Sequence, residues 1–173
     1  MRLQQQFEKG SLSCLQTVKR DEFENLVQRE QKELRRFLLA LCSGNRFEAD
    51  DIAQETLVKA YLSSDGYQEQ GRFVAWLYQI AHHTFLDHRR RARPSKDLDD
   101  AVPFTDETYN ADNSFRYQEL YLALEGLPPK ERSSILLFYL KGYSIKEISQ
   151  IIECNEDAVR KQLQRGRDQL RKK

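Results

Sequence analysis

The chain has 173 residues, of which 39% are hydrophobic and 32% charged, and its 28 Lys and Arg nearly balance its 27 Asp and Glu. This composition argues against a disordered chain and indicates one globular domain or two small ones. Since the longest apolar runs, 37–42 and 135–140, are far shorter than the roughly 18 residues of a bilayer span and no secretory signal opens the chain, we expect no membrane insertion and a cytoplasmic protein.

Residues 1–20 precede the first periodic segment and are interpreted as an N-terminal extension. Residues 21–93 are predicted to form a first domain of three helices. The first of these opens at Asp21, with Glu24 three residues later in the manner of a capping box, and it stops near Gly44.

The second helix is expected to begin near Ala49, with Asp50 and Asp51 in its first turn, where the helix dipole favours negative charge. The stretch 63–71, which contains two glycines, ends this helix. The third helix is predicted from about Arg72 and finishes in a cluster of arginines. Its inward residues are expected to be Phe73, Trp76, Leu77, Ile80, Ala81 and Thr84.

The middle of the chain has a different character. Residues 94–113 hold two of the four prolines and six acidic residues, and they show no apolar periodicity. Net charge follows the same division, at +2 over 1–93, −4 over 94–116 and +3 over 117–173. Because twenty residues without an element are uncommon inside a compact domain, we interpret 94–113 as a flexible acidic linker.

Residues 114–173 are predicted to form a second helical domain. Pro129 suits the first position of a helix, because that position needs no backbone N–H, and Gly142 closes the same helix. Ser144 with Glu147 forms another capping-box pattern. The residues expected to face inward up to this point are Tyr117, Leu120, Tyr121, Leu124, Ile135, Phe138 and Tyr139. With no strand alternation anywhere, the predicted fold is all-α, with an N-terminal helical bundle and a C-terminal helix-turn-helix.

The most specific local signal lies in the last 30 residues. Two short helices, the second predicted from Asp157, are joined by a tight turn in the manner of a helix-turn-helix. The residues available to pack them together are Ile148, Ile151, Val159 and Leu163. Residues 160–173 carry seven basic side chains and one acid, a clustering that favours binding to the phosphate backbone. The pattern predicts a DNA-binding helix, and a solvated basic tail is the alternative.

Other candidate sites are weaker. Asp51 and Glu55 share one face of the second helix, which suits a protein-docking surface better than an acid/base or metal pair, because no third ligand has suitable spacing. His82, His83 and His88 do not converge as a metal-binding pair would and are expected on an exposed polar face. The three cysteines are widely spaced and indicate free thiols. The sequence has no phosphate loop, nucleophile elbow or catalytic Cys/His pair, so we expect no enzyme, cofactor or metal.

Five segments occur in order along the chain: 48–56 (EADDIAQET), 73–81 (FVAWLYQIA), 86–91 (LDHRRR), 127–132 (LPPKER) and 142–167, which opens GYSIKEIS. With the acidic linker between them, they resemble an extracytoplasmic-function (ECF) sigma factor of the sigma-70 superfamily. The resemblance covers roughly 20–93 and 114–171. It implies an initiation factor that binds core RNA polymerase and promoter DNA, and that is commonly sequestered by an anti-sigma partner.

By the same resemblance, the first domain opens and reads the minus-ten element and the second reads the minus-35 element. The residues implied to bind core polymerase are Asp50, Asp51, Gln54 and Glu55. The residues implied to bind DNA are Ser63 and Ser64, in the loop that receives a flipped base, then His83, Arg89, Arg90 and Arg93 on the third helix, and Arg160, Lys161, Gln164 and Arg165 on the last.

Three positions depart from the family pattern. His83 stands where Asn is common, and imidazole presents a different set of donors and acceptors. Glu153 replaces the usual Gly of the turn, so a looser or differently shaped turn is expected. Gly166 lies inside the last helix at a cost of roughly 1 kcal/mol relative to Ala, which would let the end of that helix bend or fray.

Two other interpretations use part of the same sequence. A dimeric helix-turn-helix transcriptional regulator shares the C-terminal signal but gives the acids of the second helix no role. A helical interaction protein without a DNA role predicts basic residues that merely solubilise the chain. Binding to core polymerase separates all three.

Overall fold

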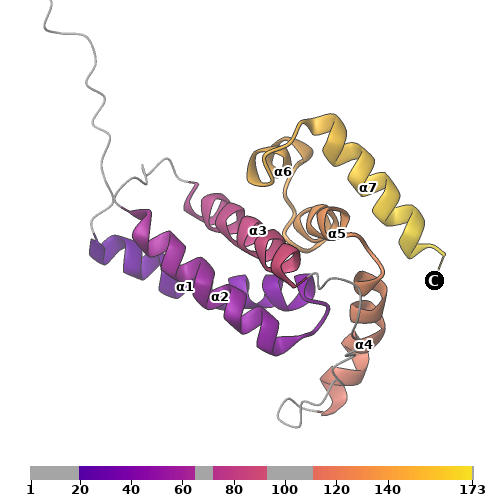
Figure 1. The fold of residues 1–173 in the computed structure, drawn as a ribbon, viewed down its shortest axis with the longest axis horizontal. Coiled ribbons are helices and arrows are strands. Elements are labelled where there is room, and N and C mark those ends of the chain that lie inside the picture. Colours follow the sequence, from indigo (N-terminus) through magenta and orange to yellow (C-terminus); the bar gives the residue numbers. More distant parts are fainter. Residues whose placement is uncertain (1–19, 65–71, 93–110, 173) are drawn as a thin grey trace, which may run out of the picture.

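The computed structural model describes residues 20–64, 72–92 and 111–172, and within these ranges the chain is helical with no strand (Figure 1). The elements are α1 (Arg20–Leu41), α2 (Arg46–Leu62), α3 (Phe73–Arg91), α4 (Ala111–Glu125), α5 (Pro129–Ile135), the π-helical segment η2 (Leu136–Leu140), α6 (Ile145–Ile151) and α7 (Glu156–Leu170). The predicted all-α fold class is confirmed. In the same ranges, no helix is both long and apolar enough to cross a bilayer.

The turn between α1 and α2 sets where α2 begins. Ser43 and Gly44 take left-handed backbone conformations, with φ of 54° and 87°, and the Asn45 side chain accepts a hydrogen bond from the Glu48 N–H at 3.2 Å. An Asn at this position satisfies one of the unpaired N–H groups of the first helical turn. Gly44 therefore follows the end of α1 as predicted, whereas α2 begins earlier than the predicted start near Ala49.

This earlier start corrects the predicted place of two acids. Asp50 and Asp51 lie beyond the first turn of α2, and Glu48 is the acid within it. The predicted capping-box residue Asp21 has a side chain outside the described part of the chain. Glu48 is therefore the acid that the helix dipole favours.

Helix α3 is buried on two sides. Four of its predicted inward residues are buried, namely Phe73, Leu77, Ala81 and Thr84, whereas Trp76 and Ile80 are only half-buried. Tyr78 is buried as well, because its ring packs edge-on against Phe37 of α1 at 4.8 Å and meets Tyr143 at 6.2 Å between centroids. One side of α3 thus contacts α1 and α2, and another faces the C-terminal helices.

In the C-terminal half, Pro129 is the first residue of α5, as predicted, and η2 continues that helix. At the end of η2 the Lys141 N–H donates to the Leu136 carbonyl, five residues back, at 3.2 Å. This wider winding changes which side chains face inward: Leu136 and Leu137 are buried, and Tyr139 is 59% exposed. The prediction that Tyr139 faces the core is wrong for this reason.

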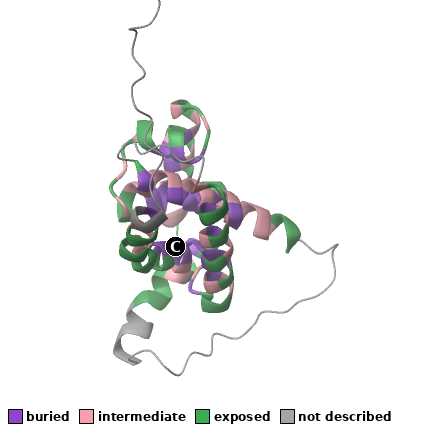
Figure 2. Ribbon diagram, turned by 90° about the vertical axis from the view of Figure 1, so that its left-hand side faces the viewer, coloured by how far each residue is buried: buried purple, intermediate pink, exposed green. Residues whose placement is uncertain are grey.

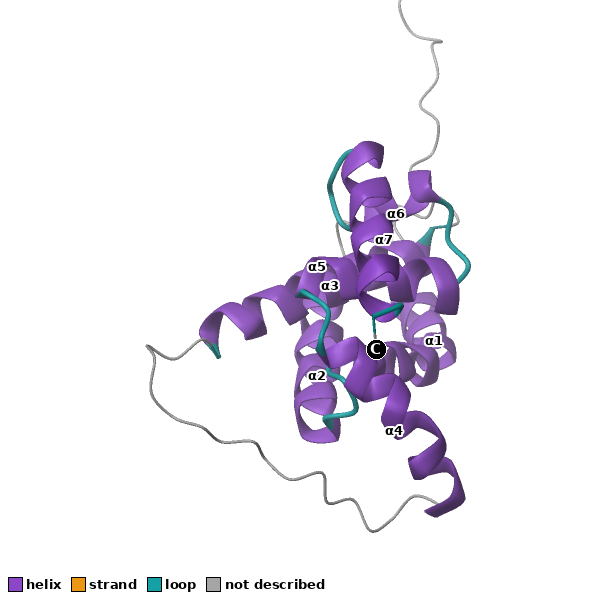
Figure 3. Cartoon of the chain, turned by 90° about the vertical axis from the view of Figure 1, so that its right-hand side faces the viewer, coloured by secondary structure: helices purple, strands orange, loops and turns teal. Residues whose placement is uncertain are grey.

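Helix α4 projects away from the other helices (Figure 3). Leu124, near its C-terminal end, is buried as predicted, but Tyr117 and Leu120 are exposed. Only the C-terminal part of the predicted apolar stripe therefore reaches the core. Of the predicted linker, 94–110 lies outside the described residues, and 111–113 begin α4.

The N-terminal and C-terminal groups of helices pack against each other and share one cluster of buried residues. Figure 2 colours the buried residues of the chain purple. Arg132 of α5 forms a buried polar link between the two groups. Its Nη1 donates to the Leu41 carbonyl at the end of α1 at 2.6 Å, and its Nη2 donates to the Glu125 and Leu127 carbonyls at 3.0 Å each. One guanidinium thus binds the C-terminal carbonyls of both α1 and α4, where positive charge is favourable. Burial lowers the pKa of Arg132 from its ordinary value.

Candidate nucleic-acid interface

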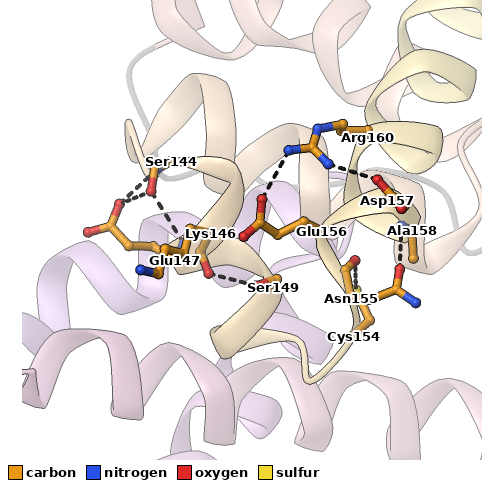
Figure 4. Close-up of polar contacts among 10 residues, drawn as sticks. All are labelled: Ser144, Lys146, Glu147, Ser149, Cys154, Asn155, Glu156, Asp157, Ala158 and Arg160. Carbon is orange, nitrogen blue, oxygen red and sulfur yellow. Dashed lines mark hydrogen bonds and ion pairs between the residues drawn. The ribbon is translucent and has the colours of Figure 1, made fainter.

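The predicted helix-turn-helix comprises α6, a tight turn and α7 (Figure 4). Its first helix opens with a complete capping box. The Glu147 N–H donates to Ser144 Oγ at 3.3 Å, and the Ser144 N–H and hydroxyl donate to Glu147 Oε2 at 2.8 and 2.6 Å. The bonds from the Ser144 hydroxyl and N–H lower the pKa of Glu147. This predicted cap is confirmed, and it fixes where α6 starts.

The turn between the helices holds the glutamate that departs from the family pattern. Glu153 has a φ of 51°, the left-handed conformation that glycine adopts most readily. The Asn155 side chain then accepts from the Ala158 N–H at 2.7 Å, so α7 begins at Glu156, one residue before the predicted Asp157. A glutamate therefore adopts the glycine-type backbone, and the turn is tight rather than loose.

Helix α7 presents the predicted DNA-reading residues to solvent. Arg160, Lys161, Gln164 and Arg165 are all exposed, and Val159 and Leu163 are buried behind them as predicted. Arg160 pairs with Asp157 at 2.8 Å and Glu156 at 3.0 Å, and Gln164 donates to Asp168 at 3.0 Å. Exposed pairs of this kind contribute little stability, so a phosphate or a base edge can replace them at small cost.

Gly166 is buried where α7 crosses α5. A Cβ at this position would lie 2.7 Å from Ile135 Cγ1 and 3.1 Å from Ile135 Cδ1, so the missing side chain allows close approach of the two helices. The helix continues past this residue to Leu170. The predicted bending or fraying at Gly166 is not observed, since tertiary packing holds the helix end.

The four residues expected to bind polymerase lie on different parts of the α2 surface. Asp51 and Gln54 are exposed. Asp50 is turned toward α1, where it pairs with Arg35 at 3.1 Å. Glu55 pairs with Lys59 at 2.8 Å and, across to α3, with Arg91 at 3.7 Å; the hydrogen bond from Lys59 is the main cause of its lowered pKa.

Sequence reasoning missed the apolar members of this surface. Phe47 and Leu62 are 81% and 74% exposed, and Val58 is also exposed. Together with Asp51 and Gln54 they follow one face of α2 at helical spacing. The signal was available as apolar residues out of phase with the buried stripe. We call these five residues the α2 stripe.

The three histidines of α3 have different environments. His82 is only 2% exposed, and its Nδ1 lies 3.0 Å from Ser133 Oγ of α5, so its predicted exposed position is wrong. Burial lowers the pKa of His82 to about 3. His83 is partly exposed and faces Glu153 at 3.4 Å, while His88 lies 3.9 Å from Glu48. No cluster of three or more metal-ligating side chains occurs among the described residues.

The basic end of α3 is tied down by local contacts. Arg89 lies 3.5 Å from Glu48 and over the Phe85 ring at 5.4 Å, and Arg90 pairs with Asp87 at 3.3 Å. Arg93, which the resemblance also implied, lies outside the described residues. Arg89 is thus partly occupied by contacts within the fold, whereas Arg90 is exposed to solvent.

Ser63 and Ser64 begin the loop that follows α2. Ser63 caps the C-terminus of α2, and the Ser64 hydroxyl donates to the Tyr61 carbonyl at 2.7 Å. The rest of the expected base-receiving loop, 65–71, lies outside the described residues. The predicted free thiols are found at Cys42 and Cys154, and burial raises the pKa of the Cys42 thiol.

Most of the chain is similar in sequence to known protein families. The sequence matches the Sigma-70 region 2 family over residues 26–94 and the Sigma-70, region 4 family over 117–170. It is 31% identical over 139 residues to the ECF RNA polymerase sigma factor EcfG of Rhodopseudomonas palustris, covering 79% of this chain and 76% of that protein. It is 32% identical over 146 residues to the ECF RNA polymerase sigma factor SigW of Bacillus subtilis, covering 75% and 76%.

Two solved structures share the fold. The sigma factor RpoE, in complex with the anti-sigma factor NepR from Bartonella quintana, gives a TM-score of 0.68 at 22% identity, covering 88% of this chain and 96% of that one. CnrH, in complex with the cytosolic domain of CnrY, gives 0.66 at 21% identity, covering 89% and 88%.

Proposed function

Because this chain belongs to the ECF RNA polymerase sigma factors, we propose that it binds core RNA polymerase and directs it to particular promoters. The observation that carries this proposal is the pairing of two surfaces of different chemistry. One is the α2 stripe, and the other is the exposed basic face of α7. Neither surface carries a catalytic group, and we assign the chain no reaction of its own.

The basic face of α7 suits a duplex. Arg160 and Arg165 supply guanidinium groups that bind phosphate or guanine, and Gln164 supplies an amide that matches adenine in the major groove. The capping box of α6 and the buried Leu163 hold this helix at a fixed angle to its partner. We assign this face to the minus-35 element.

The α2 stripe suits a protein partner. Its apolar members offer area to bury, and Asp51 gives a negative charge that pairs with a basic residue of the polymerase. Asp50 and Glu55, which the resemblance also implied, already have partners in the fold. We therefore assign polymerase binding chiefly to Asp51 and Gln54 with their apolar neighbours.

For the minus-ten element we assign the face of α3 that carries His83, together with Ser63, Ser64 and the loop after them. Arg90 lies on the same helix and is placed to hold backbone phosphate. Imidazole at position 83 would give this protein a base preference different from that of family members with Asn there.

The regulator is proposed by analogy. RpoE occurs in complex with an anti-sigma factor, and the exposed apolar residues of α2 and α4 offer area that such a partner could bury here. We place the protein in the cytoplasm, where its polymerase acts. A dimeric helix-turn-helix regulator is not favoured, because it accounts for neither the region 2 match nor the α2 stripe.

Gel filtration with core RNA polymerase tests the proposal. The wild-type chain is expected to elute with the enzyme in a one-to-one complex at moderate salt. Asp51→Arg combined with Gln54→Arg should lower its affinity at least tenfold, because two positive charges are brought to a surface that complements a basic partner. Glu119→Arg is the control, since Glu119 is an exposed acid on α4. Free elution of the wild-type chain would reject the proposed function.

A further inference from the structure

The turn of the helix-turn-helix makes a polar contact with α3. Glu153 contributes both of its carboxylate oxygens: Gln79 Nε2 donates to Oε1 at 2.7 Å, and His83 Nε2 lies 3.4 Å from Oε2. Beside them, Arg72 Nη1 donates to Gln150 Oε1 at 3.5 Å. The two groups of helices are therefore joined at this edge by the Glu153 carboxylate and by the Arg72–Gln150 hydrogen bond.

Glu153 is an unfavourable residue for its own backbone. At a φ of 51° a side chain with a Cβ is disfavoured, and Gly or Asn suits the conformation better. The Glu153 side chain does not stabilise the turn, because its contacts are with Gln79 and His83 of α3. Its presence is explained by the contact it makes with Gln79 and His83.

We propose that Glu153 is a latch that holds the helix-turn-helix closed against α3 in the free protein. Gln79 and His83 are four residues apart and share one face of α3, and the latch covers both. Arg160 and Arg165 of α7 stay exposed in the same arrangement. The closed chain thus partly covers the His83 side of α3 and leaves the α7 face free; this consequence rests on the proposed function, whereas the latch itself does not.

Two buried contacts also join the two groups of helices. His82 Nδ1 is 3.0 Å from Ser133 Oγ, and Arg132 donates across to the Leu41 carbonyl at 2.6 Å. These buried groups hold the two groups of helices together. The exposed Glu153 contact adds a small further stabilisation of the closed form, and this sets the ratio of closed to open molecules. Loss of the latch should shift that balance without unfolding either group of helices.

The test counts closed and open molecules of the full chain by single-molecule fluorescence energy transfer. Dyes are attached through Val58→Cys on α2 and Asp168→Cys on α7, in a Cys14→Ser, Cys154→Ser background. Glu153→Gly and Glu153→Asn both suit the left-handed backbone and remove the contact. Glu119→Gln is the control, because it removes the same charge from an exposed site on α4.

Both Glu153 variants are expected to raise the ratio of open to closed molecules about two- to five-fold, and Glu119→Gln should leave it unchanged. An unchanged ratio in both Glu153 variants would overturn the latch. Since this readout needs neither polymerase nor DNA, it stands even if the proposed function fails.

Binding to a fluorescent random-sequence single-stranded oligonucleotide tests the masking. The Glu153 variants should bind about two- to five-fold more tightly than wild type at low salt. An equal gain in Glu119→Gln, or no gain in any variant, would overturn the masking of α3.

Discussion

Substitution of Gly166 offers a stability test in which two effects of opposite sign can be separated. Alanine in the middle of a helix is favoured over glycine by about 1 kcal/mol. The new Cβ would meet Ile135 Cγ1 at 2.7 Å and Cδ1 at 3.1 Å, and overpacking of this kind costs about 1–3 kcal/mol. The net expectation for Gly166→Ala is a loss of up to about 2 kcal/mol in the free energy of unfolding.

The same substitution should change sign when the obstacle is removed. Ile135→Ala deletes both crowding carbons and by itself costs about 2–5 kcal/mol, because it leaves a cavity in a buried site. In that background Gly166→Ala fills space and gains its helix propensity, so it should stabilise the chain by about 1 kcal/mol. The two sites are coupled because they touch.

Urea unfolding followed by circular dichroism measures all four members of this cycle. Lys161→Ala is a control on the exposed face of α7 and should change stability by no more than about 0.5 kcal/mol. The reasoning is refuted if Gly166→Ala stabilises the wild-type chain, or if it has the same effect in both backgrounds. Either result would mean that close approach to Ile135 does not explain the glycine.

Three further predictions concern individual side chains of α7, α6 and α3. Arg160→Ala with Arg165→Ala should lower promoter-dependent run-off transcription at least tenfold and leave the complex with core polymerase intact in gel filtration; wild-type transcription would contradict their role. Ser144→Ala should destabilise the chain by about 1 kcal/mol in urea unfolding, because the capping box is lost. Ser144→Asp should retain most of the stabilisation by the cap. Since the pKa of His82 is lowered to about 3, the neutral ring stabilises the fold fully above its unfolded pKa near 6.5, and this stability is lost as the pH falls below that value. His82→Gln should therefore show a smaller loss of stability between pH 7 and 5 than wild type, and identical pH profiles would count against burial of the neutral ring.

Most helix positions could be predicted from the sequence. The residues that start or end these helices, Ser144, Pro129 and Gly44, do so through their own backbone and immediate neighbours. The start of α2 was missed, since its only sign is the single cap residue Asn45 before a turn without apolar periodicity. The exposure of Tyr139 depends on the π-helical winding of η2, for which the sequence offered no signal.

The residues that depend on distant contacts were the harder ones. Periodicity identifies one buried face, so it missed His82, which is covered by Ser133 from α5, 51 residues later in the chain. The role of Gly166 likewise depends on Ile135 of another helix. For the candidate site, the i, i+4 spacing of Glu55 and Lys59 permits the ion pair that the structure shows, but the sequence analysis did not use it and assigned Glu55 to polymerase binding.

The central claim is that this chain gives core RNA polymerase its choice of start site, and transcription on genomic DNA of its source organism tests it most directly. Core enzyme alone and core enzyme with the purified chain are compared by mapping the 5′ ends of the transcripts. We predict a small set of start sites that appear only when the chain is present and that disappear with Asp51→Arg plus Gln54→Arg. An identical pattern of 5′ ends with and without the chain would contradict the account.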